Sequence, residues 1–267
     1  MDANEDSYRQ IGGDDSITTR IGAVALPIGV VLIAISEVFH PSKVDPMDFP
    51  AVFREYASSN VWTTVHLGEY FGFLFLLGGL VALYYSVRAR PGAGAGIAPF
   101  GLAAAVTTAA SFTVLQAVDG VTLRYAIHNW VSAPASEKQA AFAAAEVARW
   151  TEIGLNGFSY FLAGLTLLIF GLAIALGRVY PRWVGLMAAI SGAALMYDGA
   201  VVVSYEGFVA DIVKLVGLLL LAVWGFIMAF LMWRNSSRRR IARPAPAPTG
   251  SENQPASSSE RSLDGRA

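Results

Sequence analysis

Long apolar stretches separated by short polar connections dominate this chain. Six stretches reach about 20 residues, the length that a helix needs to cross a hydrocarbon layer roughly 30 Å thick. Charged residues gather in the connections and after the last stretch. The pattern predicts an all-α polytopic transmembrane helix bundle, with six spans over residues 19–39, 62–87, 96–118, 153–177, 182–204 and 211–233.

The distribution of arginine predicts the orientation of these spans. The short connections after the second and fourth stretches and the segment after the sixth are basic: Arg88, Arg90, Arg178, Arg182, Arg234, Arg238, Arg239, Arg240 and Arg243. The positive-inside rule assigns such segments to the cytoplasm. We therefore expect a multi-pass protein of the cell membrane with both termini cytoplasmic, and with the longer connections 40–61 and 119–152 outside.

Composition divides the chain into three parts. Hydrophobic residues make up 55% of the sequence and charged residues 15%, well below the quarter that is usual in soluble domains. We expect a polar N-terminal segment over 1–17, a transmembrane domain over 18–234 and a disordered, basic, Pro- and Ser-rich cytoplasmic tail over 235–267. The absence of cysteine excludes disulfides and thiolate chemistry.

Small residues crowd the third and fifth stretches, which predicts that residues 96–118 and 182–204 form interior helices. A faint internal repeat accompanies them. WTTVHLGEYF and WTEIGLNGFSYF begin the second and fourth stretches, and the stretch after each ends in Val118-Asp119-Gly120 or Tyr197-Asp198-Gly199. Either the chain contains two matched helical hairpins, or two Leu- and Gly-rich segments resemble each other by chance.

Ionisable residues near the outer ends of the spans indicate a polar pocket open to the outside. An ionisable residue inside a span needs a partner, a proton or water, so it marks a possible functional site. We take Glu69, Asp198 and His66 as candidate catalytic residues. Candidate pocket residues are Glu37, Tyr70, Asp119, Glu152, Asn156 and Tyr197. The alternative is that groups near the membrane surface are simply solvated.

Two pairs three residues apart suggest a metal site. Glu37 and His40 end the first span, while His66 and Glu69 begin the second, so neighbouring helices would bring together two imidazoles and two carboxylates. Zinc and di-iron helical bundles use these ligand types. Two such pairs also arise by chance. The sequence contains no phosphate-binding loop, and we expect no organic cofactor and no nucleic-acid partner.

These observations favour a membrane protein whose outward-facing pocket binds or senses a small apolar or lipid-like molecule. The alternative is a membrane-embedded enzyme acting on an isoprenoid or lipid, either as an acid-initiated cyclase or with a metal. A transporter is less well supported, because Pro27 is the one strong breaker inside a span. The lipid bilayer is the expected partner in every case.

The segments FHPSKVDPMDF, WTTVHLGEY, RWTEIGLNGF, PRWVG and SYEGF carry a resemblance to a known group of proteins. Together they resemble a broad family of bacterial six-span membrane proteins known only as a domain of unknown function. The resemblance covers about residues 18–233 and implies a six-span fold. It implies no particular activity or site residue.

Overall fold

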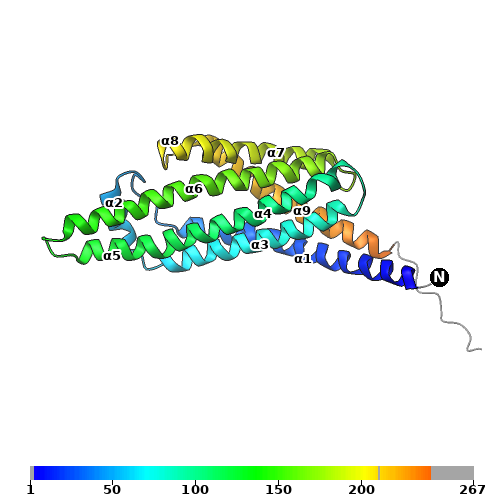
Figure 1. Ribbon diagram of the computed structural model, residues 1–267, viewed down its shortest axis with the longest axis horizontal. Coiled ribbons are helices and arrows are strands. Elements are labelled where there is room, and N and C mark those ends of the chain that lie inside the picture. The colour runs from blue at the N-terminus through cyan, green and yellow to red at the C-terminus, as the bar shows by residue number, and fades with distance from the viewer. Residues whose placement is uncertain (1–2, 210, 242–267) are drawn as a thin grey trace, which may run out of the picture.

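A computed structural model describes residues 3–209 and 211–241 of the chain, and all regular structure in this part is helical (Figure 1). Six of its helical segments are long and apolar enough to cross a membrane, as the hydropathy pattern predicts. The helices are α1 (Ala3–Phe39), α2 (Phe49–Ala57), α3 (Trp62–Arg88), α4 (Ala93–Ala117), η1 (Val118–Leu123), α5 (Arg124–Ser132), α6 (Lys138–Ala175), α7 (Arg182–Tyr197), η2 (Asp198–Val203), α8 (Ser204–Glu206) and α9 (Ile212–Ile241).

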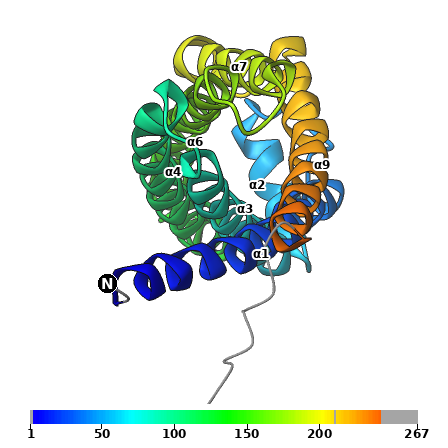
Figure 2. The same cartoon turned by 90° about the vertical axis from the view of Figure 1, so that its right-hand side faces the viewer.

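The spans form a closed ring in chain order. Each packs against the next, from α1 through α3, α4, α6 and α7 to α9, and α9 returns to pack on α1. Figure 2, which looks along the bundle, shows this ring with α2 at its far end. The start of α1 and the end of α9 lie together at the opposite end, which we call the terminal end (Figure 1). We call the end that carries α2 and α5 the capped end.

Reciprocal glycine contacts hold α6 against the helix that begins with α7. Three pairs spaced seven residues apart line this crossing: Gly157 with Gly199, Gly164 with Gly192, and Gly171 with Gly185. A Cβ added to either member of a pair would lie 2.2–3.0 Å from the carbonyl oxygen of the other. Without a hydrophobic driving force inside lipid, such close backbone packing stabilises helix pairs. The seven-residue spacing keeps all three pairs on one seam.

The capped end extends further from the spans than the sequence pattern indicates. The helix that begins with α4 continues through η1 and α5 to Ser132, and α6 already begins at Lys138. Together with α2, these extensions bury an apolar cluster around Phe53, Trp62 and Ile127. The helices therefore run on past residues 118 and 153, where the predicted spans end and begin, because the polar surface of these extensions hides their helical continuity from a hydropathy window.

The prediction that residues 96–118 form an interior helix is wrong. The third span is the least buried of the six. In a ring, every helix has one outward face, and the small residues of α4 serve a local contact instead. Gly94 lies against the backbone of Ala173, and Gly101 lies against the ring of Phe170. Small residues thus mark where α4 approaches α6 closely.

The two predicted hairpins share an unusual ending. The second helix of each passes from α-helix into a π-helical segment at an Asp-Gly pair, Asp119-Gly120 in η1 and Asp198-Gly199 in η2. Single π-helical turns are rare and are often found at functional sites. Both aspartates are buried. The common ending supports the matched hairpins over chance similarity.

The described helices also change two segment boundaries. Helix α1 begins at Ala3, within the polar segment predicted over residues 1–17. Helix α9 reaches Ile241, and so enters the segment predicted to be disordered from residue 235 onward. The rest of that segment, from residue 242, lies outside the described residues.

Candidate metal centre

Two histidines meet at the capped end of the bundle. His40 follows the end of α1, and His66 lies in the second turn of α3. Their ring centroids are 5.4 Å apart. His66 is 4% exposed, and His40 is partly buried. The α1 and α3 helices are packed neighbours, so the pairing predicted from the two short motifs brings the imidazoles together as expected.

Main-chain carbonyls orient both rings. His66 Nδ1 lies 2.7 Å from the carbonyl oxygen of Trp62, and His40 Nδ1 lies 3.0 Å from that of Pro41. A carbonyl oxygen can only accept a hydrogen bond, so Nδ1 carries the hydrogen in each ring. Nε2 is then left free for another partner. Histidines that bind metals are held in this way by a second partner on the other ring nitrogen.

Asp119 completes the cluster from η1. Its Oδ2 lies 3.1 Å from His66 Nε2, and its Oδ1 is buried without a hydrogen-bond partner. Gly120 allows this approach, since a Cβ at that position would lie 3.0 Å from the Cβ of His66. One ligand atom each from His40, His66 and Asp119 lie within 4.8 Å of one another. Three separate segments thus supply two imidazole nitrogens and a carboxylate.

The contact between His66 and Asp119 requires a proton or a cation between the two groups. A neutral imidazole with its hydrogen on Nδ1 would point the lone pair of Nε2 at a carboxylate, which is repulsive. The two atoms lie at ion-pair distance, although the His66 ring is turned out of hydrogen-bond geometry at Nε2. Either a proton on Nε2 or a metal cation between the ligands would remove the repulsion.

Aromatic rings cover this cluster. The ring centroid of Trp62 lies 4.4 Å from that of His66 and 4.2 Å from that of Tyr56 on α2, with the rings tilted toward each other. Burial lowers the pKa of His40, with the field of His66 adding to the effect and that of Asp119 opposing it. For the Tyr56 phenol, burial instead raises the pKa, so this hydroxyl keeps its proton. The cover reduces the local dielectric constant and strengthens every charge interaction beneath it.

A buried ion pair connects α6 to this cover. The Arg149 guanidinium donates to both carboxylate oxygens of Glu152, at 2.8 and 2.6 Å, and to the Tyr56 hydroxyl at 3.4 Å. It also donates to the carbonyl oxygen of Pro46, at 3.1 Å, in the connection before α2. Glu152 in turn interacts electrostatically with Asp119. The pair therefore fixes the position of α2 over the histidines.

The predicted carboxylates Glu37 and Glu69 are not among the three clustered ligands. Glu69 is buried and accepts a hydrogen bond from Gln116 Nε2 at 2.9 Å. Glu37 lies on an exposed position in the last turn of α1. The structure thus brings together the two predicted histidines, but the nearest carboxylate comes from Asp119, which the sequence placed in the pocket without a ligand role.

The remaining predicted residues lie in different surroundings. Asp198 is buried in η2, with Lys214 Nζ at 3.8 Å, and the same ammonium lies 4.1 Å from the ring centroid of Tyr160. Asn156 has a buried side-chain oxygen without a partner. Tyr197 is 49% exposed, and Tyr70 faces the space between α3 and α4. The candidates therefore form no single pocket, and Asp198 belongs to a separate ion pair.

Sequence reasoning missed several residues that shape the centre. Tyr56, Trp62 and Arg149 lie on segments that only the fold brings together, and short motifs cannot reveal them. One signal was present for Asp119: the repeated Asp-Gly ending, which in both hairpins marks a π-helical turn. Comparison with family models, with curated proteins and with solved structures finds no match for this chain.

Proposed function

We propose that this multi-pass membrane protein binds a divalent transition metal through His40, His66 and Asp119. The observation that carries the proposal is the convergence of their ligand atoms within 4.8 Å, with both imidazoles oriented through Nδ1. Two imidazoles and one carboxylate suit Zn²⁺ and also Fe²⁺. Zn²⁺ is our first expectation, since three protein ligands with one open position are its usual catalytic arrangement.

The open position suggests the type of chemistry. A water molecule bound to Zn²⁺ at such a position has a pKa of about 7 and becomes a nucleophile at neutral pH. We infer that the protein hydrolyses a small molecule dissolved in the membrane. The positive-inside rule assigns the capped end to the outside of the cell membrane, so the reaction would take place at the outer surface.

A metal-free binding or sensing role is the second candidate. The 3.1 Å distance between His66 Nε2 and Asp119 Oδ2 supports it, because a proton on Nε2 also satisfies this contact. In that case the same buried cluster would receive a ligand without transforming it. The two candidates differ in the metal content of the purified protein.

An acid-initiated cyclase has less support. Such an enzyme needs a carboxylic acid that gives up its proton to an alkene. Glu69 accepts a hydrogen bond from Gln116 and Asp198 lies beside Lys214, and neither carboxylate lines the pocket between α3 and α4. Neither is therefore placed to give a proton to a molecule bound there. Transport also has less support, because helix α1 continues without a break through Pro27.

The test is to purify the full chain in detergent with a tag that lacks histidine and to measure bound metal by mass spectrometry. We expect about one zinc ion per chain. His40→Gln, His66→Gln and Asp119→Asn should each weaken zinc binding by more than the roughly 10–100-fold that the loss of an outer-shell partner costs. His128→Gln is the matched control, because His128 is the third histidine of the sequence and lies exposed on α5.

Gel filtration and thermal unfolding of each variant show whether the fold is kept. The proposal is refuted if the wild-type protein, purified from cells grown in added zinc, contains no metal and has no measurable affinity for zinc. So would zinc binding that His66→Gln and Asp119→Asn leave unchanged. Iron in place of zinc would keep the ligand set but replace hydrolysis by redox chemistry.

A further inference from the structure

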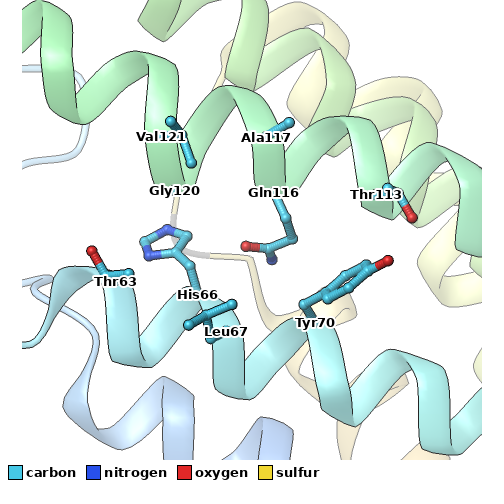
Figure 3. A pocket seen from close by; sticks show the side chains of 9 residues that line it. All are labelled: Thr63, His66, Leu67, Tyr70, Thr113, Gln116, Ala117, Gly120 and Val121. Carbon is cyan, nitrogen blue, oxygen red and sulfur yellow. The ribbon is translucent and has the colours of Figure 1, made fainter.

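A pocket between two spans adjoins the candidate metal centre. It has a volume of about 290 Å³ and lies between α3 on one side and α4 with η1 on the other (Figure 3). His66, Tyr70 and Gln116 point into the space between the helices. His66 therefore belongs both to the pocket and to the metal cluster.

The wall of the pocket is apolar and opens away from the bundle. Leu67, Ala117 and Val121 line it with exposed side chains, and Leu67 and Val121 are each 51% exposed. These positions lie within candidate membrane spans, so we infer that their exposed surface faces lipid. A molecule can therefore enter sideways from the bilayer. The volume lies at the lower end of the roughly 300–1,000 Å³ of small-molecule sites, which suits one chain better than a two-chain lipid.

Polar groups lie at the capped end of the pocket and further along it. At the capped end the Arg124 guanidinium donates a hydrogen bond to the Thr63 hydroxyl, and Thr63 lines the pocket. Within the described part of the chain, no carboxylate forms an ion pair with Arg124. Deeper in the pocket, the Oε1 atom of Gln116 is buried without a hydrogen-bond partner. Arg124 thus carries a positive charge without a counter-ion at the capped end of the pocket.

We propose that this pocket takes a single-chain membrane amphiphile with an anionic head, of the long-chain carboxylate type. Its chain lies along Leu67, Ala117 and Val121, and its head lies at Arg124 beside His66. The chain direction agrees with the membrane, since Tyr70 lies about 10 Å deeper along α3 than Thr63. That this carboxylate is the acid product formed when the centre hydrolyses an ester or amide rests on the proposed metal function, whereas the pocket itself does not.

The probe is a long-chain fatty acid with a photoreactive diazirine near the chain end, added to the purified full-length protein in lipid nanodiscs. We expect labelling to map to peptides from α3 and from the end of α4. Ala117→Trp fills the pocket and should lower labelling at least ~10-fold. Ala110→Trp is the matched control, because Ala110 lies exposed two turns earlier on the same side of α4 and outside the pocket.

The matching fatty alcohol tests the head. Arg124→Gln should lower labelling by the acid and leave labelling by the alcohol unchanged. Labelling that Ala117→Trp does not change, or that maps to other helices, would overturn the pocket. Equal loss with acid and alcohol would overturn the anionic head. Zinc is measured in the same samples, so protein that labels as expected but lacks zinc would refute the metal function alone.

Discussion

At the scale of single residues, the capped end depends on charges that are buried in pairs. Arg149 is 1% exposed and Glu152 is 3% exposed, and the Arg149 guanidinium also holds the Pro46 carbonyl. Removing one charge of a buried pair leaves the other without compensation, which costs more than removing both. This asymmetry separates the effect of the charge from the effect of the side-chain volume.

We predict that Arg149→Met lowers the free energy of unfolding by about 3–5 kcal/mol, because Glu152 is left as an uncompensated buried charge. The double variant Arg149→Met, Glu152→Met should regain most of this loss. Unfolding in mixed micelles, followed by circular dichroism, measures both. If the double variant is no more stable than Arg149→Met, the loss comes from packing and the account of the ion pair is wrong.

The residues of the candidate centre were partly predictable from the sequence. His66 and Glu69 inside a span could not face lipid, and the spacing of Glu37 and His40 indicated a second pair on the neighbouring helix. The repeated Asp-Gly ending pointed to Asp119, but not to its pairing with His66, which is a long-range contact between α3 and η1. Likewise, the orientation of each imidazole depends on a backbone carbonyl that no sequence motif specifies.

At the scale of helices, close glycine contacts fix how the elements cross. The sequence identified the small residues but not their partners, so it assigned α4 to the interior when its glycines only mark the contact with α6. Helices α2 and α5 also escaped a hydropathy window, because each is only 9 residues long. The sequence does predict the length and the apolarity of the membrane-spanning helices, because the thickness of the bilayer imposes both.

We predict that Gly164→Ala destabilises the bundle, because the added Cβ would lie 2.6 Å from the backbone nitrogen of Met196 and collide with the Gly192 carbonyl. Overpacking of this kind typically costs about 1–3 kcal/mol. Gly154→Ala on the same helix has open space around its Cβ and should be neutral or slightly stabilising. Thermal unfolding of the two variants compares them, and equal midpoints would contradict the role of the glycine seam.

At the scale of the whole molecule, the ring places its chemistry at one end. The histidine cluster and the cover formed by α2 lie at the capped end. The start of α1 and the end of α9 lie at the terminal end, together with the basic connections between spans (Figure 1). If the positive-inside rule holds here, the candidate centre faces the outside of the cell. A metal ion or ligand would then reach the centre from the membrane or from outside the cell.

The natural absence of cysteine makes this orientation easy to test. We predict that a cysteine in place of Ser136, which is exposed between α5 and α6, reacts with a membrane-impermeant maleimide added to intact cells. A cysteine in place of Arg90, exposed between α3 and α4, should react only after the membrane is made permeable. Labelling of the Arg90→Cys variant in intact cells, with protection of Ser136→Cys, would reverse the topology.

The most direct test of the metal centre is X-ray absorption spectroscopy of the purified, metal-loaded protein at the zinc edge. We predict four ligands, of which two give the scattering pattern of imidazole at about 2.0–2.1 Å and the others are oxygen. His66→Gln should reduce the imidazole contribution to one ring, and His128→Gln should leave the spectrum unchanged. A first shell of oxygen alone, or a spectrum that His66→Gln does not alter, would contradict a centre built from His40, His66 and Asp119.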